Sequence, residues 1–400
     1  MSRLGPLRER EFRLLFAGQT VSRLGSAIAP IALAFAVLDL TGSKADLGIV
    51  LAVRQVAVIV LLLFGGVWAD RLPRHRVMVW SNLTSGISQA IVAGLLLSHQ
   101  ATITYLAVFA AVNGASSAFF FPASNGIVPQ TVPAGILQQA NALLRLGTNA
   151  TSITGQALGG IVVAAAGPGY GIAADALSYA LAALALQSMS ARAPERTGAT
   201  TVLQELGAGW SDFWSRPWLW AVVLQFGFVN AAWVGALQVL GPAVAKAHYG
   251  GAGAYAAMLV ALQVGFICSG LVLLRWRPHR ILRTATLAVF GFAVPLVALA
   301  RPEHLLVVVA AMFVTGVCSE IFGVLWDTTY QQEIPNELRS RVASYDALGS
   351  WVLMPVGFAV VGPLSDAVGA GRTLVALAAL ITLVTALTFL SRDVRELSRA

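Results

Sequence analysis

Ionisable side chains occur inside several of the most apolar stretches of this 400-residue chain. They are Arg23, Arg54, Arg145, Asp175, Glu320, Asp327 and Asp346. A charge at the centre of a lipid bilayer costs about 2.5 to 3.5 kcal/mol on insertion scales, and such residues are usually paired or functional. Burial raises the pKa of a carboxyl group and a nearby arginine lowers it. These residue types therefore point to reversible proton binding.

Glu320 and Asp327 are the first candidates for such a role. They are seven residues apart in one apolar run, which places them on one face of a helix, about 10.5 Å apart along its axis. Glu320 lies deepest and is the first choice. Asp327 has an equal interpretation as a cap, or a partner of Arg339 or Arg341, at the helix end. Arg145 is a third candidate, because no acid lies beside it in sequence.

The remaining intramembrane charges have other interpretations. Arg23 follows Gln19 in the first run. Its side chain either faces a cavity or extends toward the membrane surface, so that the guanidinium reaches water. Arg54 lies a third of the way into the second run and can reach the outer interface. Asp175, close to the start of its apolar run, is predicted to be structural.

These charges must be positioned by helices that cross a membrane. The chain is 57% hydrophobic and 11% charged, whereas roughly a quarter of the residues in a soluble domain are charged. A helix needs about 20 apolar residues to cross a bilayer. The chain has twelve such runs, at 13–38, 47–69, 77–98, 102–122, 138–166, 170–190, 218–241, 252–274, 282–300, 304–327, 342–365 and 372–391.

The distribution of lysine and arginine predicts the orientation of these spans. Of the 26 residues of these two types, 19 lie in the terminal segments and the even-numbered loops and 4 in the odd-numbered loops. Positive residues are retained on the cytoplasmic side, so we expect both termini to be cytoplasmic in a multi-pass protein of the cell (inner) membrane. The net charge of +8 is then a topology signal, and we expect no nucleic-acid partner. Cys268 and Cys318 lie inside apolar runs, so we expect no disulfide, metal or cofactor.

An internal repeat divides the chain. A shift of 202 residues superimposes seven residues of the first half on identical ones in the second: Gly114 on Gly316, Gln130 on Gln332, Pro133 on Pro335, Gly147 on Gly349, Gly155 on Gly357, Gly160 on Gly362 and Gly167 on Gly369. This predicts a six-helix bundle over 1–190, a cytoplasmic linker with an interfacial helix over 191–216, and a second six-helix bundle over 217–400. Two parallel halves are typical of alternating-access transporters, whose site lies between the halves.

A short loop carries a family resemblance. The segment 66–76, GVWADRLPRHR, resembles the signature G-x-x-x-D-R-x-G-R-(R/K)-(R/K) of the major facilitator superfamily, with Pro73 in place of a glycine and His75 in place of a basic residue. Segments 141–160 and 335–346 resemble the bacterial drug-efflux branch, which includes macrolide and siderophore exporters. The resemblance implies an all-α membrane protein with 12 transmembrane helices in two pseudo-symmetric bundles, the major facilitator fold.

The same resemblance implies a cytoplasmic gate. Its members are Gly66, Asp70, Arg71, Arg74 and Asp346. Asp70 would end the second helix facing the positive N-terminal end of the eleventh, and Asp346 would pair with Arg71 or Arg74 to close the cytoplasmic mouth. An exposed pair is worth about 0 to 1 kcal/mol, so it can break in each cycle. The alternative is that these arginines only anchor the topology.

The fifth helix partly matches an antiporter signature, G-x-x-x-G-P-x-x-G-G. In the segment 151–160 the glycines Gly155, Gly159 and Gly160 match, and the first glycine and the proline do not. Small residues at this spacing let helices approach closely in lipid. Relatives also carry an arginine in the fourth helix before a glycine, whereas here Asn113 precedes Gly114.

Polar and aromatic side chains suggest a substrate cavity. The candidates are Arg23, Asn113, Phe120, Phe226 and Trp233, which could line a pocket for an amphipathic compound. Each aromatic residue has the alternative of facing lipid.

The absence of other motifs narrows the function. The sequence contains no phosphate-binding glycine loop, no metal-ligand spacing and no nucleophile elbow, so we expect neither an ATP-driven pump nor an enzyme. We expect a monomeric secondary transporter in the lipid bilayer that exports amphipathic drugs or secondary metabolites in exchange for protons. The alternatives are an uptake or facilitative carrier of the same fold, or a membrane binding protein that does not transport.

Overall fold

The fold is known from a computed structural model, which describes residues 5–190, 210, 213–276 and 278–397; the side chains of 63–71, 336–341 and 344 are outside the description. All regular secondary structure in the described residues is helical. Most of the predicted linker, 191–216, lies outside the described residues. Contacts divide the chain into two compact units, Met1–Arg196 with Gly250–Ala257, and Thr197–Tyr249 with Met258–Ala400.

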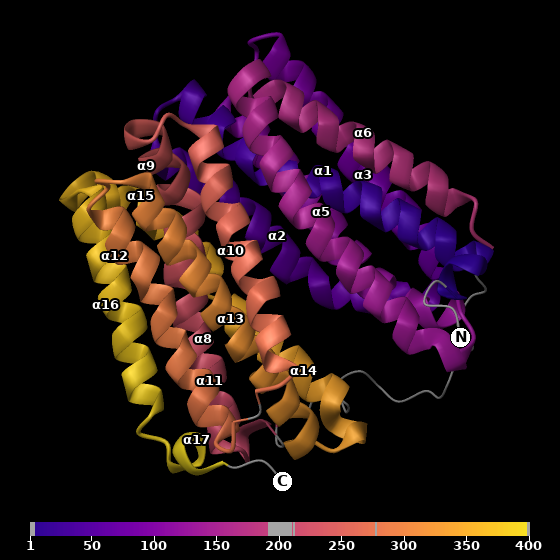
Figure 1. The fold of residues 1–400 in the computed structure, drawn as a ribbon. Coiled ribbons are helices and arrows are strands. Elements are labelled where there is room, and N and C mark those ends of the chain that lie inside the picture. The colour runs from indigo at the N-terminus through magenta and orange to yellow at the C-terminus, as the bar shows by residue number, and fades with distance from the viewer. Residues whose placement is uncertain (1–4, 191–209, 211–212, 277, 398–400) are drawn as a thin grey trace. The chain divides into compact units, whose positions relative to one another are not determined.

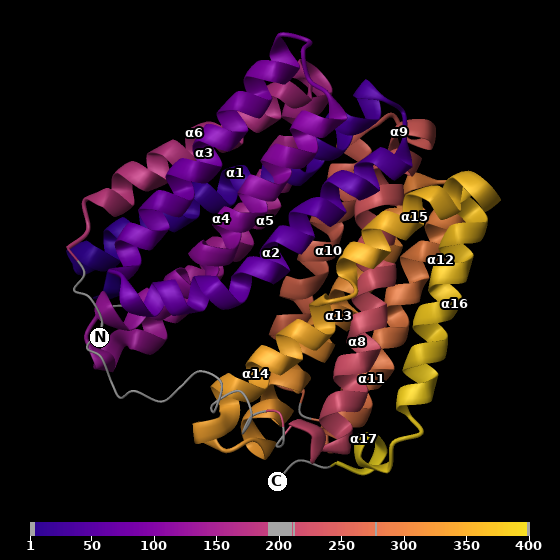
Figure 2. The same cartoon turned by 180° about the vertical axis from the view of Figure 1, so that it is seen from behind.

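The first unit is built from six long helices that run side by side (Figures 1 and 2). They are α1 (Arg10–Leu40), α2 (Lys44–Arg71), α3 (Arg74–Leu97), α4 (Ile103–Ile127), α5 (Leu137–Ala166) and α6 (Pro168–Gln187). Short 3₁₀ turns, at Gly5–Arg8, Val128–Gln130 and Ala134–Ile136, connect or precede them. Each long helix corresponds to one predicted apolar run, with ends that differ from the prediction by one to a few residues.

The second unit also follows the predicted runs, but three of its helices are interrupted. Its elements are α8 (Pro217–Gly235), the π-helical turn η4 (Ala236–Leu240), α9 (Gly241–His248), α10 (Ala252–Leu273), α11 (Ile281–Val289), the 3₁₀ turn η5 (Phe290–Ala293), α12 (Val294–Ala300), α13 (Leu305–Glu333), α14 (Asn336–Trp351), α15 (Met354–Val368), α16 (Ala370–Thr388) and α17 (Arg392–Glu396). The pairs α8 and α9, α11 and α12, and α14 and α15 each form one membrane-spanning segment.

Proline explains where these three interruptions fall. Pro242, Pro295 and Pro355 each stand at the second residue of the helix that follows the interruption. A proline has no backbone N–H and its ring clashes with the carbonyl four residues earlier, so regular α-helical hydrogen bonding fails in the preceding turn. The spans therefore continue in direction but change helical geometry at these points.

Ten helical segments of the described chain are long and apolar enough to cross a membrane. The remaining two, α3 and α5, have 24 and 30 residues but carry more polar side chains. The described residues therefore form an all-α membrane protein, and with α3 and α5 the helical segments match the twelve predicted runs. Several observed ends extend beyond the apolar runs, as in α13, which continues to Glu333, because polar turns at a helix end can be solvated outside the bilayer.

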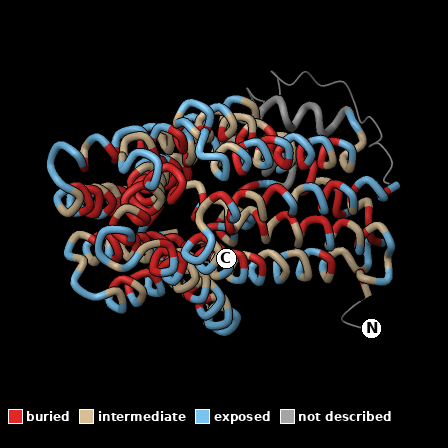
Figure 3. The backbone as a smooth tube through the Cα atoms, turned by 90° about the horizontal axis from the view of Figure 1, so that it is seen from above, coloured by how far each residue is buried: buried red, intermediate tan, exposed pale blue. Residues whose placement is uncertain are grey.

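Large apolar side chains are exposed on the outer faces of the bundles. Leu306 and Leu390 are 77% and 75% exposed, and exposed residues alternate with buried ones around each helix (Figure 3). In water so extensive an apolar surface would drive association, whereas lipid tails cover it without cost. The buried positions face the neighbouring helices instead.

The repeated glycines perform the same packing role in both units. A Cβ on Gly114 of α4 would lie 2.3 Å from the carbonyl oxygen of Arg54 on α2, and a Cβ on Gly316 of α13 would lie 2.0 Å from that of Leu262 on α10. Only glycine allows backbones to come this close. The 202-residue repeat thus corresponds to equivalent helix crossings.

Two further glycine pairs repeat in the same way. A Cβ on Gly155 would lie 2.6 Å from the carbonyl oxygen of Leu24 on α1, and one on Gly357 would lie 2.1 Å from that of Ala231 on α8. Gly167 and Gly369 follow α5 and α15 with φ of +94° and +91°, a region that favours glycine. Crossings and turns are therefore both preserved between the halves.

Candidate functional site

A carboxyl group is completely buried in the first unit. Asp175 of α6 is 0% exposed, and its Oδ2 accepts a hydrogen bond of 2.6 Å from Nε2 of Gln89 on α3. Its Oδ1 has no hydrogen-bond partner among the described residues. Burying a carboxyl group of which only one oxygen is hydrogen-bonded is unfavourable for the free energy of folding. The surrounding polar groups must therefore offset that cost.

Arg54 on α2 contributes to this offset. Its guanidinium interacts electrostatically with Asp175 and Tyr179 of α6, and its Nε donates to Oδ1 of Asn113 on α4 at 3.3 Å. The hydroxyl of Ser26 on α1 donates to that of Tyr179 at 3.0 Å. Helices α1, α2, α3, α4 and α6 thus each place a polar side chain in one buried cluster.

The cluster changes the interpretation of two residues. Arg54 is directed into the bundle instead of reaching the outer interface. It meets Asn113, which precedes Gly114 on α4. The guanidinium of α2 is therefore held against α4. The signal for the cluster was present in the sequence as polar residues, Gln89 and Tyr179, inside apolar runs, but their mutual contacts were not predicted.

Arg23 makes a second polar link, between α1 and α5. Its Nη1 donates to Oγ1 of Thr148 at 2.5 Å, and its Nη2 donates to Oε1 of Gln19 at 3.5 Å. Arg23 is half-buried, whereas Arg145, on the same helix as Thr148, is exposed. The structure therefore ties Arg23 to α5 and leaves Arg145 at the surface of its unit.

Aromatic rings form a continuous row in the second unit, from α8 and η5 to α13. The ring centroids of Phe226 and Phe322 are 4.1 Å apart and stacked, and Phe226 and Trp233 each meet Phe292, at 6.4 and 5.6 Å. The row continues from Phe322 to Trp326 at 5.9 Å. Trp233 is only 7% exposed, so it supports the row from within the bundle, while Phe226 is half-buried.

The candidate acids of α13 lie on the same helix as this row. Glu320 is half-buried, and its Oε1 lies 3.7 Å from the position of a Cβ on Gly270 of α10. Asp327 is exposed. Asp346 of α14 accepts hydrogen bonds from Nε1 of Trp326 at 3.2 Å and from Oγ of Ser350 at 3.3 Å. One carboxylate is therefore bound directly to a ring of the aromatic row, that of Trp326.

The predicted gate is described only in part. Gly66, Asp70 and Arg71 fall in the last turns of α2, where the side chains are outside the described residues. Arg74 begins α3 and donates to the carbonyl oxygen of Gly126 on α4, and a Cβ on Gly126 would overlap the guanidinium. The pairing of Asp346 with an arginine of this loop stays a prediction.

Comparison with known proteins gives the family. The family model for the Major Facilitator Superfamily matches residues 15–358. The chain belongs to this superfamily. It is therefore a multi-pass membrane transporter, which acts on a small-molecule substrate within a lipid bilayer.

Individual relatives of this superfamily member cover almost the whole chain. The multidrug efflux pump Tap of Mycolicibacterium fortuitum is 27% identical over 97% of both chains. The enterobactin exporter EntS of Escherichia coli O1:K1 is 25% identical over 93% of this chain and 91% of its own. The solved nucleoside transporter NupG superimposes with a TM-score of 0.76 at 13% identity, over 95% and 98% of the two chains. A bacterial homologue of ferroportin gives 0.69 at 17%, over 95% and 98%. These two structures show the fold alone.

The antiporter-like glycines of this superfamily member lie in tight contacts. A Cβ on Gly159 would lie 3.1 Å from Cα of Ile28 on α1, and one on Gly160 would lie 2.3 Å from Cβ of Ala256. Phe120 packs against the core of the first unit. These residues therefore have packing roles whatever they contribute to transport.

Proposed function

We propose that the protein is a proton-coupled exporter of amphipathic small molecules that works by alternating access. The two named relatives are an efflux pump and an exporter, and each matches at least 93% of this chain, which supports outward transport. We further propose a monomer in the inner membrane, with both termini cytoplasmic and without enzymatic activity. The positive-inside distribution of arginine and lysine supports that orientation.

The observation that carries the proposal is the aromatic row beside the acids of α13. Rings bind apolar and aromatic parts of a ligand with little loss of conformational freedom, and a few polar groups orient it. Phe226 and Phe322 supply the stacked faces, and Asp346 supplies a carboxylate hydrogen-bonded to Trp326 of the row. An amphipathic substrate with a cationic or hydrogen-bonding group suits this combination.

Proton coupling is assigned first to Glu320. It is half-buried on the helix that carries Phe322 and Trp326, so binding of a substrate to the rings and binding of a proton to the acid can compete. Asp327, more exposed, is the second candidate, and Arg145 the third. In the gate, Asp346 would exchange its partners between Trp326 within its own unit and an arginine of the 66–76 loop.

The test is proton-linked flux in inside-out membrane vesicles with an acidic interior. A panel of lipophilic drugs is added to vesicles holding the wild type, Glu320→Gln or Asp327→Asn, and pH and drug content are followed. Glu303→Gln is the matched control, because Glu303 is exposed and precedes α13. We expect drug to dissipate the gradient in the wild type and the control, and Glu320→Gln to abolish the response while still binding drug.

Other outcomes would reassign the function. Drug flux that is independent of the gradient and survives both substitutions would identify a facilitative carrier or coupling to another ion. Flux only in the opposite direction would identify uptake. Drug binding with no flux in any protein would identify a membrane binding protein.

A further inference from the structure

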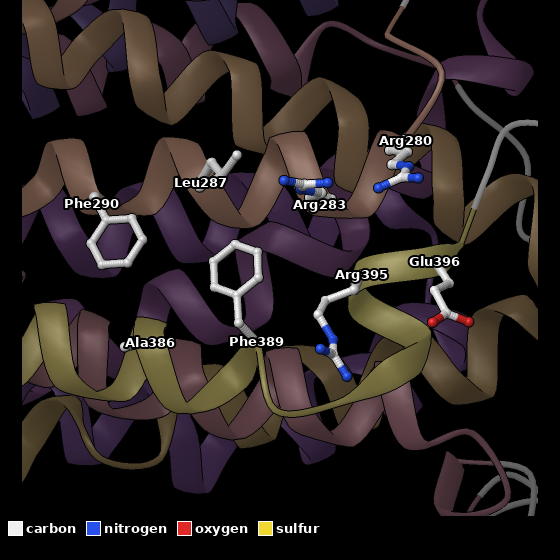
Figure 4. Close-up of a pocket in the computed structure, with 8 residues that line it drawn as sticks. All are labelled: Arg280, Arg283, Leu287, Phe290, Ala386, Phe389, Arg395 and Glu396. Atoms are coloured by element: carbon white, nitrogen blue, oxygen red, sulfur yellow. The ribbon is translucent and has the colours of Figure 1, made fainter.

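A groove in the second unit has a charged end and an apolar end. Its volume is about 610 Å³. The charged end holds Arg280, Arg283 and Arg395, and the apolar end holds Leu287, Phe290 and Phe389. Figure 4 shows the guanidinium groups gathered toward one end and the two rings toward the other. This division fits a ligand with an anionic head and an apolar tail.

The apolar end is a preformed surface for a hydrocarbon chain. The rings of Phe290 in η5 and Phe389 after α16 are stacked, with centroids 6.3 Å apart and planes at 4°. Leu287, on the same side, is 49% exposed. Phe290 follows Arg283 by seven residues, which corresponds to about 10.5 Å along a helix. The groove thus runs from the charged helix ends into the depth of the membrane span.

The charged end is built from two separate elements. Arg280 and Arg283 come from the start of α11 and Arg395 comes from α17, which is held against the bundle by Val394, 0% exposed. All three arginines are exposed, and none of them forms a salt bridge with a carboxylate in the part of the chain that the structure describes. Glu396 lies at the same end and reduces its positive charge without cancelling it.

We propose that this groove binds an acidic phospholipid, with its phosphate on the arginines and the upper part of an acyl chain against Phe290 and Phe389. Guanidinium groups bind phosphate oxygens in pairs of parallel hydrogen bonds. By the predicted orientation the arginines lie at the cytoplasmic leaflet, where anionic lipids attract basic residues. A free phosphate would use only the charged end, whereas a lipid uses both.

Lipid binding to the purified full-length protein in dodecyl maltoside tests the proposal. Dioleoylphosphatidylglycerol and dioleoylphosphatidylcholine are titrated separately, and bound lipid is measured by native mass spectrometry. We expect tighter binding of phosphatidylglycerol, weakened about fivefold by each of Arg283→Gln and Arg395→Gln. Arg301→Gln is the matched control, because Arg301 is an exposed arginine at the far end of α12, and it should leave the affinity unchanged.

A variant that is expected to tighten lipid binding distinguishes loss of the site from a folding defect. Glu396→Gln removes the one acid of the groove and should tighten phosphatidylglycerol binding, which a misfolded protein would not do. Equal affinity for the two lipids would overturn the proposal, as would equal weakening by Arg301→Gln and the groove variants. Displacement of phosphatidylglycerol by an equal concentration of inorganic phosphate would also overturn it, since the apolar end would then contribute nothing.

Discussion

Replacement of Asp175 by leucine should destabilise the first helix bundle through Gln89. The side chain of Gln89 donates to Asp175 Oδ2 at 2.6 Å, and leucine is close in size but accepts no hydrogen bond. A buried donor left without a partner costs about 1 to 3 kcal/mol. Asp175→Asn keeps an acceptor of the same shape for Gln89, so the free energy of unfolding should fall by less than in Asp175→Leu, by about 1 kcal/mol.

A double-mutant cycle isolates this hydrogen bond. Gln89→Leu alone leaves the carboxyl group of Asp175 without its donor, and the pair Asp175→Leu with Gln89→Leu leaves neither group unpaired. The double variant should therefore be more stable than the sum of the single effects predicts, by about 1 to 2 kcal/mol. The free energy of unfolding is measured in mixed detergent micelles, with the helix content as the signal.

Two results would refute this reasoning. If Asp175→Leu is as stable as the wild type, the buried carboxyl group is not offset by Gln89 and Arg54. If the two single effects add without coupling, the contact at 2.6 Å does not contribute to the native state. A loss of drug-linked proton flux in Asp175→Asn at unchanged stability would instead give this acid a functional role.

Three other predictions follow from named contacts. Gly114→Ala and Gly316→Ala should each lower the free energy of unfolding by about 1 to 3 kcal/mol through overpacking, because their Cβ atoms would lie 2.3 and 2.0 Å from carbonyl oxygens. Thermal unfolding measures this effect. An unchanged unfolding temperature for either variant would contradict the equivalence of the two helix crossings. Trp326→Phe keeps an aromatic ring, though a smaller one, and removes the hydrogen bond to Asp346. It should lower the free energy of unfolding by about 1.5 to 3 kcal/mol, and the effect should be smaller in an Asp346→Asn background. Burial and the neighbouring Arg76 lower the pKa of His75, although Glu11 opposes them. The unfolded state therefore binds the proton more readily than the folded state. The resulting stability is present above the unfolded pKa and falls as the pH drops through it toward the folded pKa. His75→Gln should reduce that acid-side loss, and identical pH profiles would contradict it.

Local sequence properties determined the membrane spans and the internal symmetry. Each apolar run had to become a helix, because a lipid environment leaves backbone groups no other partner. The glycines repeated at 202 residues marked equivalent crossings, since glycine alone permits the approach seen at Gly114 and Gly316. The loop 66–76 also indicated the family, because a sequence motif can be recognised without knowledge of the tertiary contacts of its residues.

Only the tertiary structure decided which polar groups meet. The rotation of each helix about its axis sets the direction of its side chains. An apolar run faces lipid on one side and protein on the other, and because both surroundings accept apolar residues the sequence specifies that rotation only weakly. Arg54 could therefore be expected at the interface, yet it donates to Asn113 on another helix. Asp346 accepts a hydrogen bond from Trp326, 20 residues away in sequence, a contact that the sequence did not indicate. Such contacts depend on the simultaneous packing of several helices, which no single segment of sequence encodes.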